Sequence, residues 1–338
     1  LGAAAFIIVM PNSDYNTFKG RMKFYMMRKS TILNRTKEGE GASIPTFFVR
    51  EDAADVWFEA SKKMKKIVKI KKKGEKKGVV ATGGFPCTFN YSLDINRTEF
   101  NGKNVLAYLP GTDKDLKEEV VVITSHYDHI GIVDGEINNG ADDDGSGTVT
   151  VMELARVYMN ASKNGDGPRR SVLFMNVVGE EKGLLGSEWY SDHPIFPLEN
   201  TVANLNIDMI GRVDEAHSGD ENYIYLIGSD KLSSELHEIS ESANASFTNI
   251  TLDYTFNAPD DPNRFYYRSD HYNFAKHNIP VIFYFSGVHE DYHAPGDDVE
   301  KIMFTKMTNV GRLAFHTAWE LLNRDEKIVV DKVNDFKD

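Results

Sequence analysis

Apolar residues along the second part of the chain gather in short continuous runs that polar stretches separate. The clearest runs are residues 120–123, which are all Val or Ile, and residues 171–175. Continuous apolar runs of this length are typical of strands buried on both faces of a largely parallel sheet. The same pattern predicts strands near residues 102–109, 119–125, 171–178, 203–209, 222–228 and 280–285.

The stretches between these runs are predicted to be helical. The expected helices lie near residues 146–160, 183–191, 231–244, 270–277 and 300–323. Alternation of strands and helices is typical of a three-layer α/β/α domain, with helices on both faces of a mostly parallel central sheet. Sites in such open sheets lie at the carboxyl ends of the strands.

The first part of the chain has a different pattern and predicts a small α+β module. Strands are expected over residues 3–9 and 44–49, and a helix over residues 52–64. A Gly-rich break follows, so the predicted domains are residues 1–85 and 86–338. Neither an initiator Met nor a signal sequence precedes the first strand, so we expect this chain to be processed or trimmed.

Composition and charge narrow the classes of function. The chain is 41% hydrophobic and 27% charged, as in an ordinary folded protein, and no apolar stretch reaches the roughly 18–20 residues of a membrane span. The net charge is −12, but residues 62–77 hold ten Lys and one Glu, which leaves −21 for the remainder. This run lacks Arg and interleaved aromatic residues. We therefore interpret it as a solvated helix end followed by an edge strand, and expect no nucleic-acid binding.

The candidate chemistry lies where predicted strands end. Side chains that can bind metals occur there in a series: His126, Asp143, Glu181, Asp208 and His293. Asp208 lies within an apolar run, where an unpaired charge is costly and a bound metal would remove that cost. The series is what two zinc ions sharing one carboxylate require. Glu180, which precedes Glu181, is then a spare carboxylate that can accept a proton from metal-activated water.

The residues around the first ligand support this interpretation. Asp128 stands two residues after His126 and can accept a hydrogen bond from its second imidazole nitrogen, the usual support of a metal-bound His. His129 is a rival for the ligand role. A single His after a strand would otherwise be read as structural.

Three successive Asp residues, 142–144, stand between glycines before a predicted helix. The simplest interpretation is a charged loop whose Asp caps the helix. Adjacent carboxylates repel one another, however, unless cations neutralise them. A central Asp143 that bridges two zinc ions would do so, and the glycines would let the backbone bend around the ions.

Together these motifs resemble the co-catalytic zinc peptidase family of bacterial leucyl aminopeptidases and glutamate carboxypeptidases. The segments that carry the resemblance are residues 104–107, 109–112, 126–128, 140–147, 180–181, 205–209, 269–271 and 292–293. The resemblance implies a zinc exopeptidase domain with two zinc ions per chain. It makes Asp143 the bridging ligand, with His126 and Asp208 on one zinc.

The resemblance implies further roles. Glu181 and His293 would bind the other zinc, and Glu180 would be the general base. The peptide bond after Asp143 is expected to be cis. Tyr266 falls where bacterial aminopeptidases have a Tyr that stabilises the oxyanion, with Tyr267 as an adjacent rival.

Supporting roles and the first module follow from the same resemblance. Asp128 and Asp270 are expected to support the metal ligands. Residues 1–85 resemble the later part of a protease-associated domain. The resemblance also implies export, to a secreted, periplasmic or cell-surface location.

The leading hypothesis is a zinc-dependent exopeptidase, preferably an aminopeptidase that releases N-terminal residues from a peptide substrate. A carboxypeptidase or dipeptidase would need a cation for the terminal carboxylate, and Arg268 and Arg264 are candidates. A non-catalytic, receptor-like binding module is the third class. Glutaminyl cyclase, a single-zinc relative, is disfavoured because His126 and the insert are kept. The oligomeric state stays open.

Overall fold

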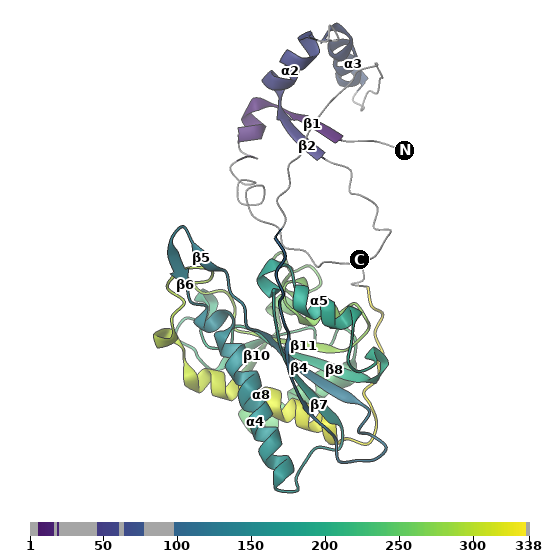
Figure 1. The fold of residues 1–338 in the computed structure, drawn as a ribbon, viewed down its shortest axis with the longest axis vertical. Helices are drawn as coiled ribbons and strands as arrows, with labels where there is room; N and C mark the ends of the chain where they lie inside the picture. The colour runs from purple at the N-terminus through teal and green to yellow at the C-terminus, as the bar shows by residue number, and fades with distance from the viewer. Residues whose placement is uncertain (1–5, 17–18, 20–45, 61–63, 78–97, 336–338) are drawn as a thin grey trace. The chain divides into compact units, whose positions relative to one another are not determined.

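The computed structural model of the chain describes residues 6–16, 19, 46–60, 64–77 and 98–335. The chain divides into two compact units, Leu1–Glu99 and Phe100–Asp338 (Figure 1). The predicted boundary after residue 85 lies outside the described residues. None of the helices in the described ranges is long and apolar enough to cross a membrane.

In its described residues, the first unit contains a short parallel sheet, a helical segment over residues 12–16 and two longer helices. Its elements are β1 (Phe6–Met10), β2 (Thr46–Arg50), α2 (Glu51–Ala60) and α3 (Met64–Lys77). Strands β1 and β2 pair in parallel, with Ile8 opposite Phe48. The predicted strand residues 3–5 and 44–45 lie outside the described residues.

The Lys-rich segment forms α3, so the edge strand predicted for part of it is wrong. Ile67 and Ile70 are half-buried, whereas Lys65, Lys66 and Lys69 are exposed. Residues three apart share one face of a helix, and Lys is a good helix former. The helical spacing of these two Ile residues therefore outweighs the β propensity of the Ile and Val residues in the segment.

The second unit is built on a seven-stranded sheet in the order β10-β9-β11-β8-β4-β7-β3. These strands are β3 (Val105–Leu109), β4 (Val120–His126), β7 (Ser171–Val177), β8 (Thr201–Ile207), β9 (Tyr223–Ile227), β10 (Thr251–Asp253) and β11 (Val281–Phe285). The four central strands β11, β8, β4 and β7 are parallel. Strand β3 is antiparallel to β7, and β9 is antiparallel to β11 but parallel to β10. The predicted strands are confirmed.

Three short strands were not predicted. They are β10 and the hairpin of β5 (Gly131–Val133) and β6 (Glu136–Asn138), each of three residues. A run this short contains too few positions to show a two-residue periodicity.

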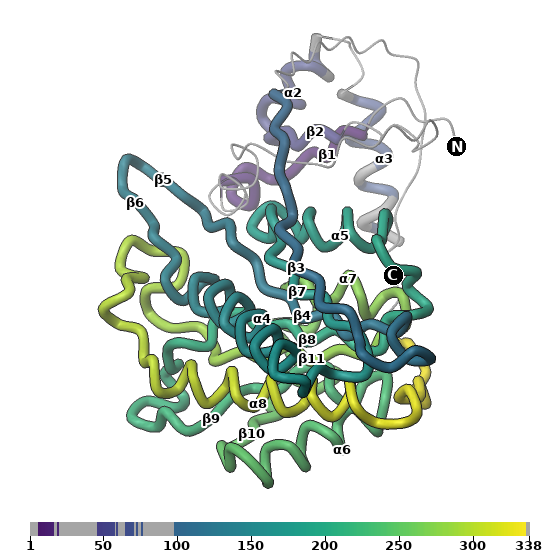
Figure 2. Tube along the Cα trace, turned by 60° about the horizontal axis from the view of Figure 1, so that its bottom comes forward, coloured from purple at the N-terminus to yellow at the C-terminus, as the bar shows by residue number. Residues whose placement is uncertain are grey.

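Helices cover both faces of the large sheet, as a three-layer α/β/α domain requires. They are α4 (Gly147–Lys163), α5 (Leu185–Asp192), α6 (Ser234–Ala243), α7 (His271–Ala275) and α8 (Phe304–Asn323). Alternate residues of β4 point to opposite faces. Val121 and Ile123 pack in one core with residues of α4, α6 and α8. Val120 and Val122 pack in the other core, with Tyr190 of α5 and residues of α7. Figure 2 shows α4 and α8 on one side of the central strands and α5 and α7 on the other.

The parallel strands bring the predicted ligands to one edge of the sheet. Strand β4 ends at His126, β8 ends one residue before Asp208, and β7 ends three residues before Glu180. In the register of β4 and β7, His126 lies opposite Val177. Because carboxyl ends of parallel strands meet at the same edge, the candidate site lies there.

Candidate metal centre

The other four predicted ligands form two pairs around the side chain of Asp143. The Nε2 atom of His126 lies 3.2 Å from Asp143 Oδ1 and 3.6 Å from Asp208 Oδ1. The Nε2 atom of His293 lies 3.2 Å from Asp143 Oδ2 and 3.1 Å from Glu181 Oε1. The two oxygens of Asp143 therefore face two different ligand sets, as a bridging carboxylate would.

Hydrogen bonds from distant segments hold the loop that carries Asp143. The carboxylate of Asp297 accepts hydrogen bonds from the backbone N–H groups of Asp142, at 2.9 and 3.1 Å, and of Asp143, at 3.1 Å. Asp142 Oδ1 accepts a hydrogen bond from the N–H of Gly211 at 2.6 Å. The peptide bond between Asp143 and Asp144 is cis, as expected.

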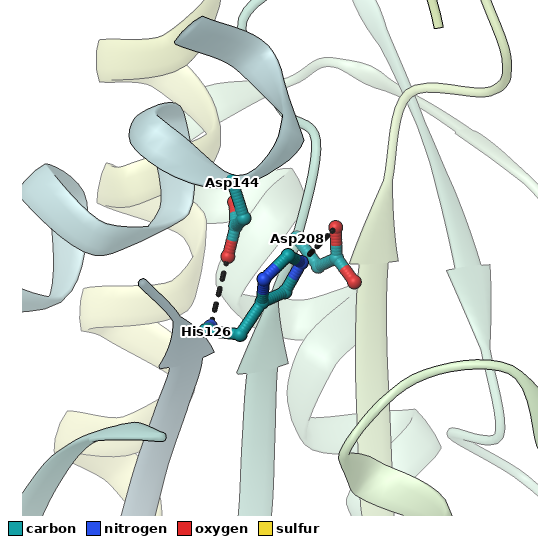
Figure 3. Close-up of side chains that lie close together, drawn as sticks. All are labelled: His126, Asp144 and Asp208. Carbon is teal, nitrogen blue, oxygen red and sulfur yellow. Dashed lines mark hydrogen bonds and ion pairs between the residues drawn. The ribbon is translucent and has the colours of Figure 1, made fainter. Parts of the chain in front are cut away.

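Asp144 lies beside His126 and Asp208, but its carboxylate accepts hydrogen bonds from backbone N–H groups (Figure 3). One ligand atom from each of these three residues lies within 4.8 Å of the others. The carboxylate of Asp144 accepts hydrogen bonds from the N–H groups of His126 at 3.1 Å, Gly147 at 2.9 Å and Met209 at 3.2 Å. It therefore joins the end of β4, the start of α4 and the segment after β8.

Asp128 supports the site in a different way from the one predicted. The His126 Nδ1 atom lies 2.9 Å from the backbone oxygen of Asp128, and 3.8 Å from its carboxylate Oδ1. That carboxylate oxygen instead accepts hydrogen bonds from the N–H groups of Gly179 at 2.8 Å and Glu180 at 3.1 Å. Asp128 thus orients the imidazole with its main chain and the Glu180 backbone with its side chain.

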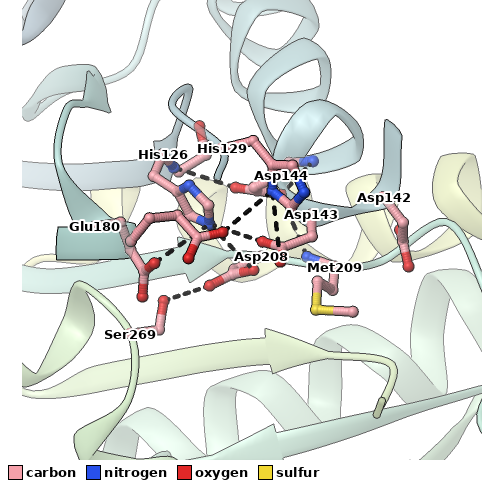
Figure 4. A network of polar contacts seen from close by, with 12 residues as sticks. His126, His129, Asp142, Asp143, Asp144, Glu180, Asp208, Met209 and Ser269 are labelled. Carbon is pink, nitrogen blue, oxygen red and sulfur yellow. Dashed lines mark hydrogen bonds and ion pairs between the residues drawn. The ribbon is translucent and has the colours of Figure 1, made fainter. Parts of the chain in front are cut away.

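The side chain of Asp208 is held by Ser269 (Figure 4). The Ser269 hydroxyl donates to Asp208 Oδ2 at 2.6 Å and accepts from Asn206 Nδ2 at 2.8 Å. Asp270, to which the resemblance assigns a supporting role, accepts a hydrogen bond from Ser187 at 2.5 Å. The hydrogen bond to a predicted ligand therefore comes from Ser269, the first residue of the segment 269–271, and not from Asp270.

Glu180 lies next to the His126 set. Its Oε2 atom is 3.9 Å from His126 Nε2, and its side chain is 13% exposed. Burial raises the pKa of the Glu180 carboxyl well above its ordinary value. A carboxyl group of this kind accepts a proton more readily than an exposed one.

The second ligand set consists of Asp143, Glu181 and His293, and its carboxylates attract positive charge. Burial opposes a positive charge on His293, but Asp143 and Glu181 raise its pKa to about 9. Burial likewise opposes a negative charge on Glu181, yet His129 and His293 lower its pKa to about 2. The carboxylates of this set thus draw positive charge onto neighbouring groups.

Buried polar atoms at the centre test whether a metal would fit. Within the described part of the chain, His126 Nε2, Asp143 Oδ2 and both ring nitrogens of His129 are buried without a hydrogen-bond partner. Such atoms are costly unless a partner is supplied. Imidazole and carboxylate ligands suit zinc and similar divalent ions. The donor set therefore fits a metal centre. His129 is among these donors, although the sequence analysis considered it only as an alternative to His126.

Two adjoining cavities open beside these residues. The smaller is lined by Asp143, Glu180, Asp208, Met209, Phe265, Arg268, Phe283, Phe285, Val288 and Tyr292. The larger, of about 620 Å³, is lined by Asp214, Glu215, Ala216, Phe256, Asn263, Phe265, Arg268, Val288 and Tyr292. They share Phe265, Arg268, Val288 and Tyr292, so the larger cavity adjoins the one that contains the predicted ligands.

Tyr266 lies elsewhere than its predicted role requires. It is 4% exposed, packs in the hydrophobic core and lines neither cavity, whereas Tyr292 lines both. Successive residues of the 3₁₀ turn Phe265–Tyr267 point in directions about 120° apart. Phe265 faces the cavities, and Tyr266 therefore turns into the core.

Comparison with known proteins relates the second unit to peptidases. A family model described as peptidase family M28 matches residues 104–318. Aminopeptidase YwaD from Bacillus subtilis (strain 168) is 28% identical over 222 residues, which cover 63% of this chain and 44% of that protein. A probable leucine aminopeptidase from Arthroderma otae is 30% identical over 225 residues, covering 64% of this chain and 57% of that protein. The chain spans about half the length of these relatives.

A solved structure shows the same fold. BSAP, a zinc aminopeptidase from Bacillus subtilis, superposes with a TM-score of 0.51 at 24% sequence identity. The similarity covers 68% of this chain and 53% of that chain. The three-layer arrangement of the second unit is therefore shared with a zinc aminopeptidase.

Proposed function

Since this chain belongs to peptidase family M28, we propose that it is a zinc-dependent exopeptidase, and specifically an aminopeptidase. The observation that carries the proposal is the convergence of two ligand sets on opposite oxygens of Asp143. Glu180 and Asp208 line the same cavity as Asp143, so a peptide bond in that cavity could reach all of them. The aminopeptidase relatives favour release of N-terminal residues.

Two zinc ions per chain are part of this proposal. His126 and Asp208 would hold one ion, Glu181 and His293 would hold the other, and Asp143 would be shared between them. When bound, such a pair supplies Lewis acidity that lowers the pKa of water and polarises a carbonyl group. Ser269 keeps Asp208 in position for this role through its hydrogen bond to Oδ2.

Glu180 is the proposed general base. Its carboxylate takes a proton from the attacking water and then gives that proton to the departing amine. The raised pKa of Glu180 supports the role, because the group must hold a proton between the two steps. The hydrogen bonds from the Gly179 and Glu180 N–H groups to Asp128 keep this side chain at the cavity wall.

Tyr292 is proposed as the phenol that binds the developing oxyanion, in place of Tyr266. Tyr292 lines both cavities and precedes His293 in the chain. Burial raises the pKa of Tyr292, so its hydroxyl keeps its proton at neutral pH and can donate a hydrogen bond. Donors placed where charge develops stabilise the transition state of acyl transfer.

Glu180→Gln tests the proposal. The variant should bind as much zinc as the wild type, while kcat on aminoacyl p-nitroanilides falls about 100- to 10,000-fold. Glu136→Gln, at an exposed position of the β5–β6 hairpin, is the matched control and should leave kcat unchanged. Turnover close to that of the wild type in Glu180→Gln would remove Glu180 from the mechanism.

Arg268 favours a second candidate function, a carboxypeptidase or dipeptidase. It lines both cavities, and within the described ranges its guanidinium forms no ion pair but lies 4.9 Å from the centre of the Phe265 ring. Arg264 instead lies over Tyr267 and lines neither cavity. An unpaired guanidinium in the cavity could bind a free C-terminal carboxylate. Hydrolysis of N-blocked peptides with free C-termini, without hydrolysis of p-nitroanilides, would favour this function.

The remaining parts of the proposal concern location and the first unit. We place the protein in a secreted, periplasmic or cell-surface location and assign residues 1–85 to part of a protease-associated domain. Both rest on the resemblance to exported bacterial peptidases. A non-catalytic receptor of the same fold would bind zinc without hydrolysing any peptide substrate, so the activity assays above also separate this class.

A further inference from the structure

His129 is a buried imidazole that the five-ligand pattern does not use. It lies three residues after His126, between β4 and the β5–β6 hairpin, and its side chain is 9% exposed. Neither of its ring nitrogens has a hydrogen-bond partner among the described residues. A buried polar ring without partners costs free energy, so a ligand for one of its nitrogens would remove a real penalty.

The Nδ1 atom of His129 points at the second ligand set. It lies 3.1 Å from Glu181 Oε1 and 3.7 Å from Asp143 Oδ2. These are the same two oxygens that His293 Nε2 approaches, at 3.1 and 3.2 Å. One atom each from His129, Asp143 and Glu181 lie within 4.8 Å of one another.

These four distances are close to the separations expected between neighbouring ligands of one zinc ion. Zinc binds nitrogen and oxygen ligands at about 2.0–2.1 Å, which separates neighbouring ligands of a tetrahedral site by about 3.3 Å. The measured separations of 3.1, 3.1, 3.2 and 3.7 Å lie close to that value. The His129 and His293 rings meet edge to face, with an angle of 67° and centres 5.8 Å apart. Two rings arranged in this way can direct nitrogens at one point without overlapping.

The backbone of Gly140 keeps the His129 ring in place. A Cβ atom added at Gly140 would lie 2.5 Å from His129 Cγ, so the glycine backbone packs directly against the ring. Gly140 has φ of +67°, in the left-handed region that glycine adopts without strain. The ring is therefore confined on the side of the Asp loop, and its Nδ1 remains directed at the two carboxylates.

We infer that His129 binds the second metal through Nδ1, which gives that ion four protein ligands: His129, Asp143, Glu181 and His293. The inference rests on the proposed function, because it requires a metal at this position. The first set then has only three protein ligands, His126, Asp143 and Asp208. Closed four-ligand sites are typical of firmly held ions, whereas catalytic ions keep an open position.

Two consequences follow for the order and strength of metal binding. The four-ligand set binds its ion first and retains it more strongly than the three-ligand set does. The three-ligand set, next to Glu180, keeps room for water and substrate. His129 is therefore a determinant of metal affinity at one of the two positions and has no direct contact with substrate.

The test is a metal titration of the full chain that does not depend on activity. Metal-free protein is titrated with Zn²⁺ in competition with a chromophoric chelator, and bound zinc is counted by elemental analysis. The wild type should bind two equivalents with separate affinities. His129→Ala should weaken the tighter equivalent at least about 100-fold and leave the other within a few-fold. His193→Ala, at the residue that follows α5 and stacks on Trp189, is the control and should titrate like the wild type.

Further measurements separate the possible outcomes. His129→Gln offers an amide that could donate a hydrogen bond to Glu181 but no imidazole for the metal, so wild-type affinity in this variant would overturn the inference in favour of a positioning role. Wild-type protein loaded with one equivalent of Co²⁺ should give the strong visible absorption of a four-coordinate ion. A weak spectrum would overturn the inference even if His129→Ala did not fold. Wild-type protein that binds no metal would defeat the proposed function, whereas two equivalents bound with the same affinities by wild type and His129→Ala would defeat only this inference.

Discussion

The residues at the metal centre are of two kinds: those that would bind an ion, and those that orient these ligands through hydrogen bonds. Asp144 and Asp297 accept hydrogen bonds from backbone N–H groups of the site, and Ser269 donates one to Asp208. Supporting contacts of this kind orient ligands and are commonly worth a 10- to 100-fold change in metal affinity. The order of the site therefore depends on residues that need not touch the metal.

Ser269→Ala should weaken zinc binding without unfolding the protein. The change removes the 2.6 Å hydrogen bond to Asp208 Oδ2, so Asp208 can rotate away from His126. Affinity of the three-ligand set should fall about 10- to 100-fold, as measured by chelator competition. Ser187→Ala is the control, since it removes a hydrogen bond to Asp270, which is not a proposed ligand. Equal zinc affinity in wild type and Ser269→Ala would contradict the role of Ser269.

Among the elements, β7 and α8 are joined by one buried guanidinium. Arg170, just before β7, is fully buried and forms an ion pair with Glu119 at 2.5 Å. Its side chain also donates to the carbonyl oxygens of Leu321, Arg324 and Asp325. Leu321 lies in the last turn of α8, and Arg324 and Asp325 directly follow the helix, so N–H groups of the helix leave these carbonyls without a partner.

Arg170→Met should be strongly destabilising. Met fills a similar volume but leaves Glu119 without its cation and the end of α8 without donors. The free energy of unfolding should fall by about 3–5 kcal/mol, measured by urea denaturation. Arg156→Met, which breaks an exposed pair with Glu153, is the control and should change stability by less than about 1 kcal/mol. A similar small change in Arg170→Met would show that this contact does not hold α8.

Lys306 gives α8 a pH-dependent contact with β9. Its Nζ atom lies 3.7 Å from the centre of the Tyr223 ring and donates to the Tyr223 carbonyl. Burial lowers the pKa of Lys306 from 10.5 to about 8. Between these two values the unfolded chain binds more protons at this residue than the folded protein does. The contribution of Lys306 to stability therefore rises as pH rises from about 8 to 10.5.

Lys306→Met should remove this rise. The free energy of unfolding of the wild type should increase relative to that of Lys306→Met by about 3 kcal/mol between pH 7.5 and 10.5. Denaturant unfolding of both proteins at several pH values, at fixed zinc concentration, measures the difference. Lys301→Met, at an exposed residue, is the control and should follow the wild type across this range. A difference that stays constant with pH would contradict the lowered pKa.

On the scale of the whole molecule, the metal centre joins distant parts of the second unit. It combines the ends of β4 and β8, the loop before α4, the segment after β7 and the loop after β11. Asp143, Glu180, Glu181 and Asp208 bring several carboxylates into one small volume. Without a cation, their mutual repulsion opposes the assembly of these segments.

Removal of metal should therefore lower the thermal stability of the unit. A ligand whose free concentration is 100 times its Kd raises the free energy of unfolding by about 2.7 kcal/mol. This corresponds to a change in Tm of roughly 5–10 °C for a unit of this size. Differential scanning calorimetry with a chelator should show this decrease, and added zinc should reverse it. Asp143→Ala, which lacks the bridging carboxylate, should not respond to the chelator. A wild-type Tm that is independent of chelator would contradict metal binding at this centre.

The sequence by itself determined the main strands and the edge at which the predicted ligands lie. Runs such as residues 120–123 are apolar on both faces, and only a buried, largely parallel sheet satisfies them. Parallel strands end at the same edge, so polar residues after β4, β7 and β8 had to come together. His126, Glu181 and Asp208 could therefore be grouped from their positions along the chain.

Only the tertiary structure decided which atoms make the contacts. The backbone oxygen of Asp128, rather than its carboxylate, meets His126, and Tyr292 rather than Tyr266 lines the cavities. His129 joins the second ligand set because the backbone of Gly140 packs against its ring. Hydrophobic periodicity reports which face of an element is buried. The direction of a single side chain depends on backbone angles and on packing against segments far away in the sequence, and these exist only in the folded chain.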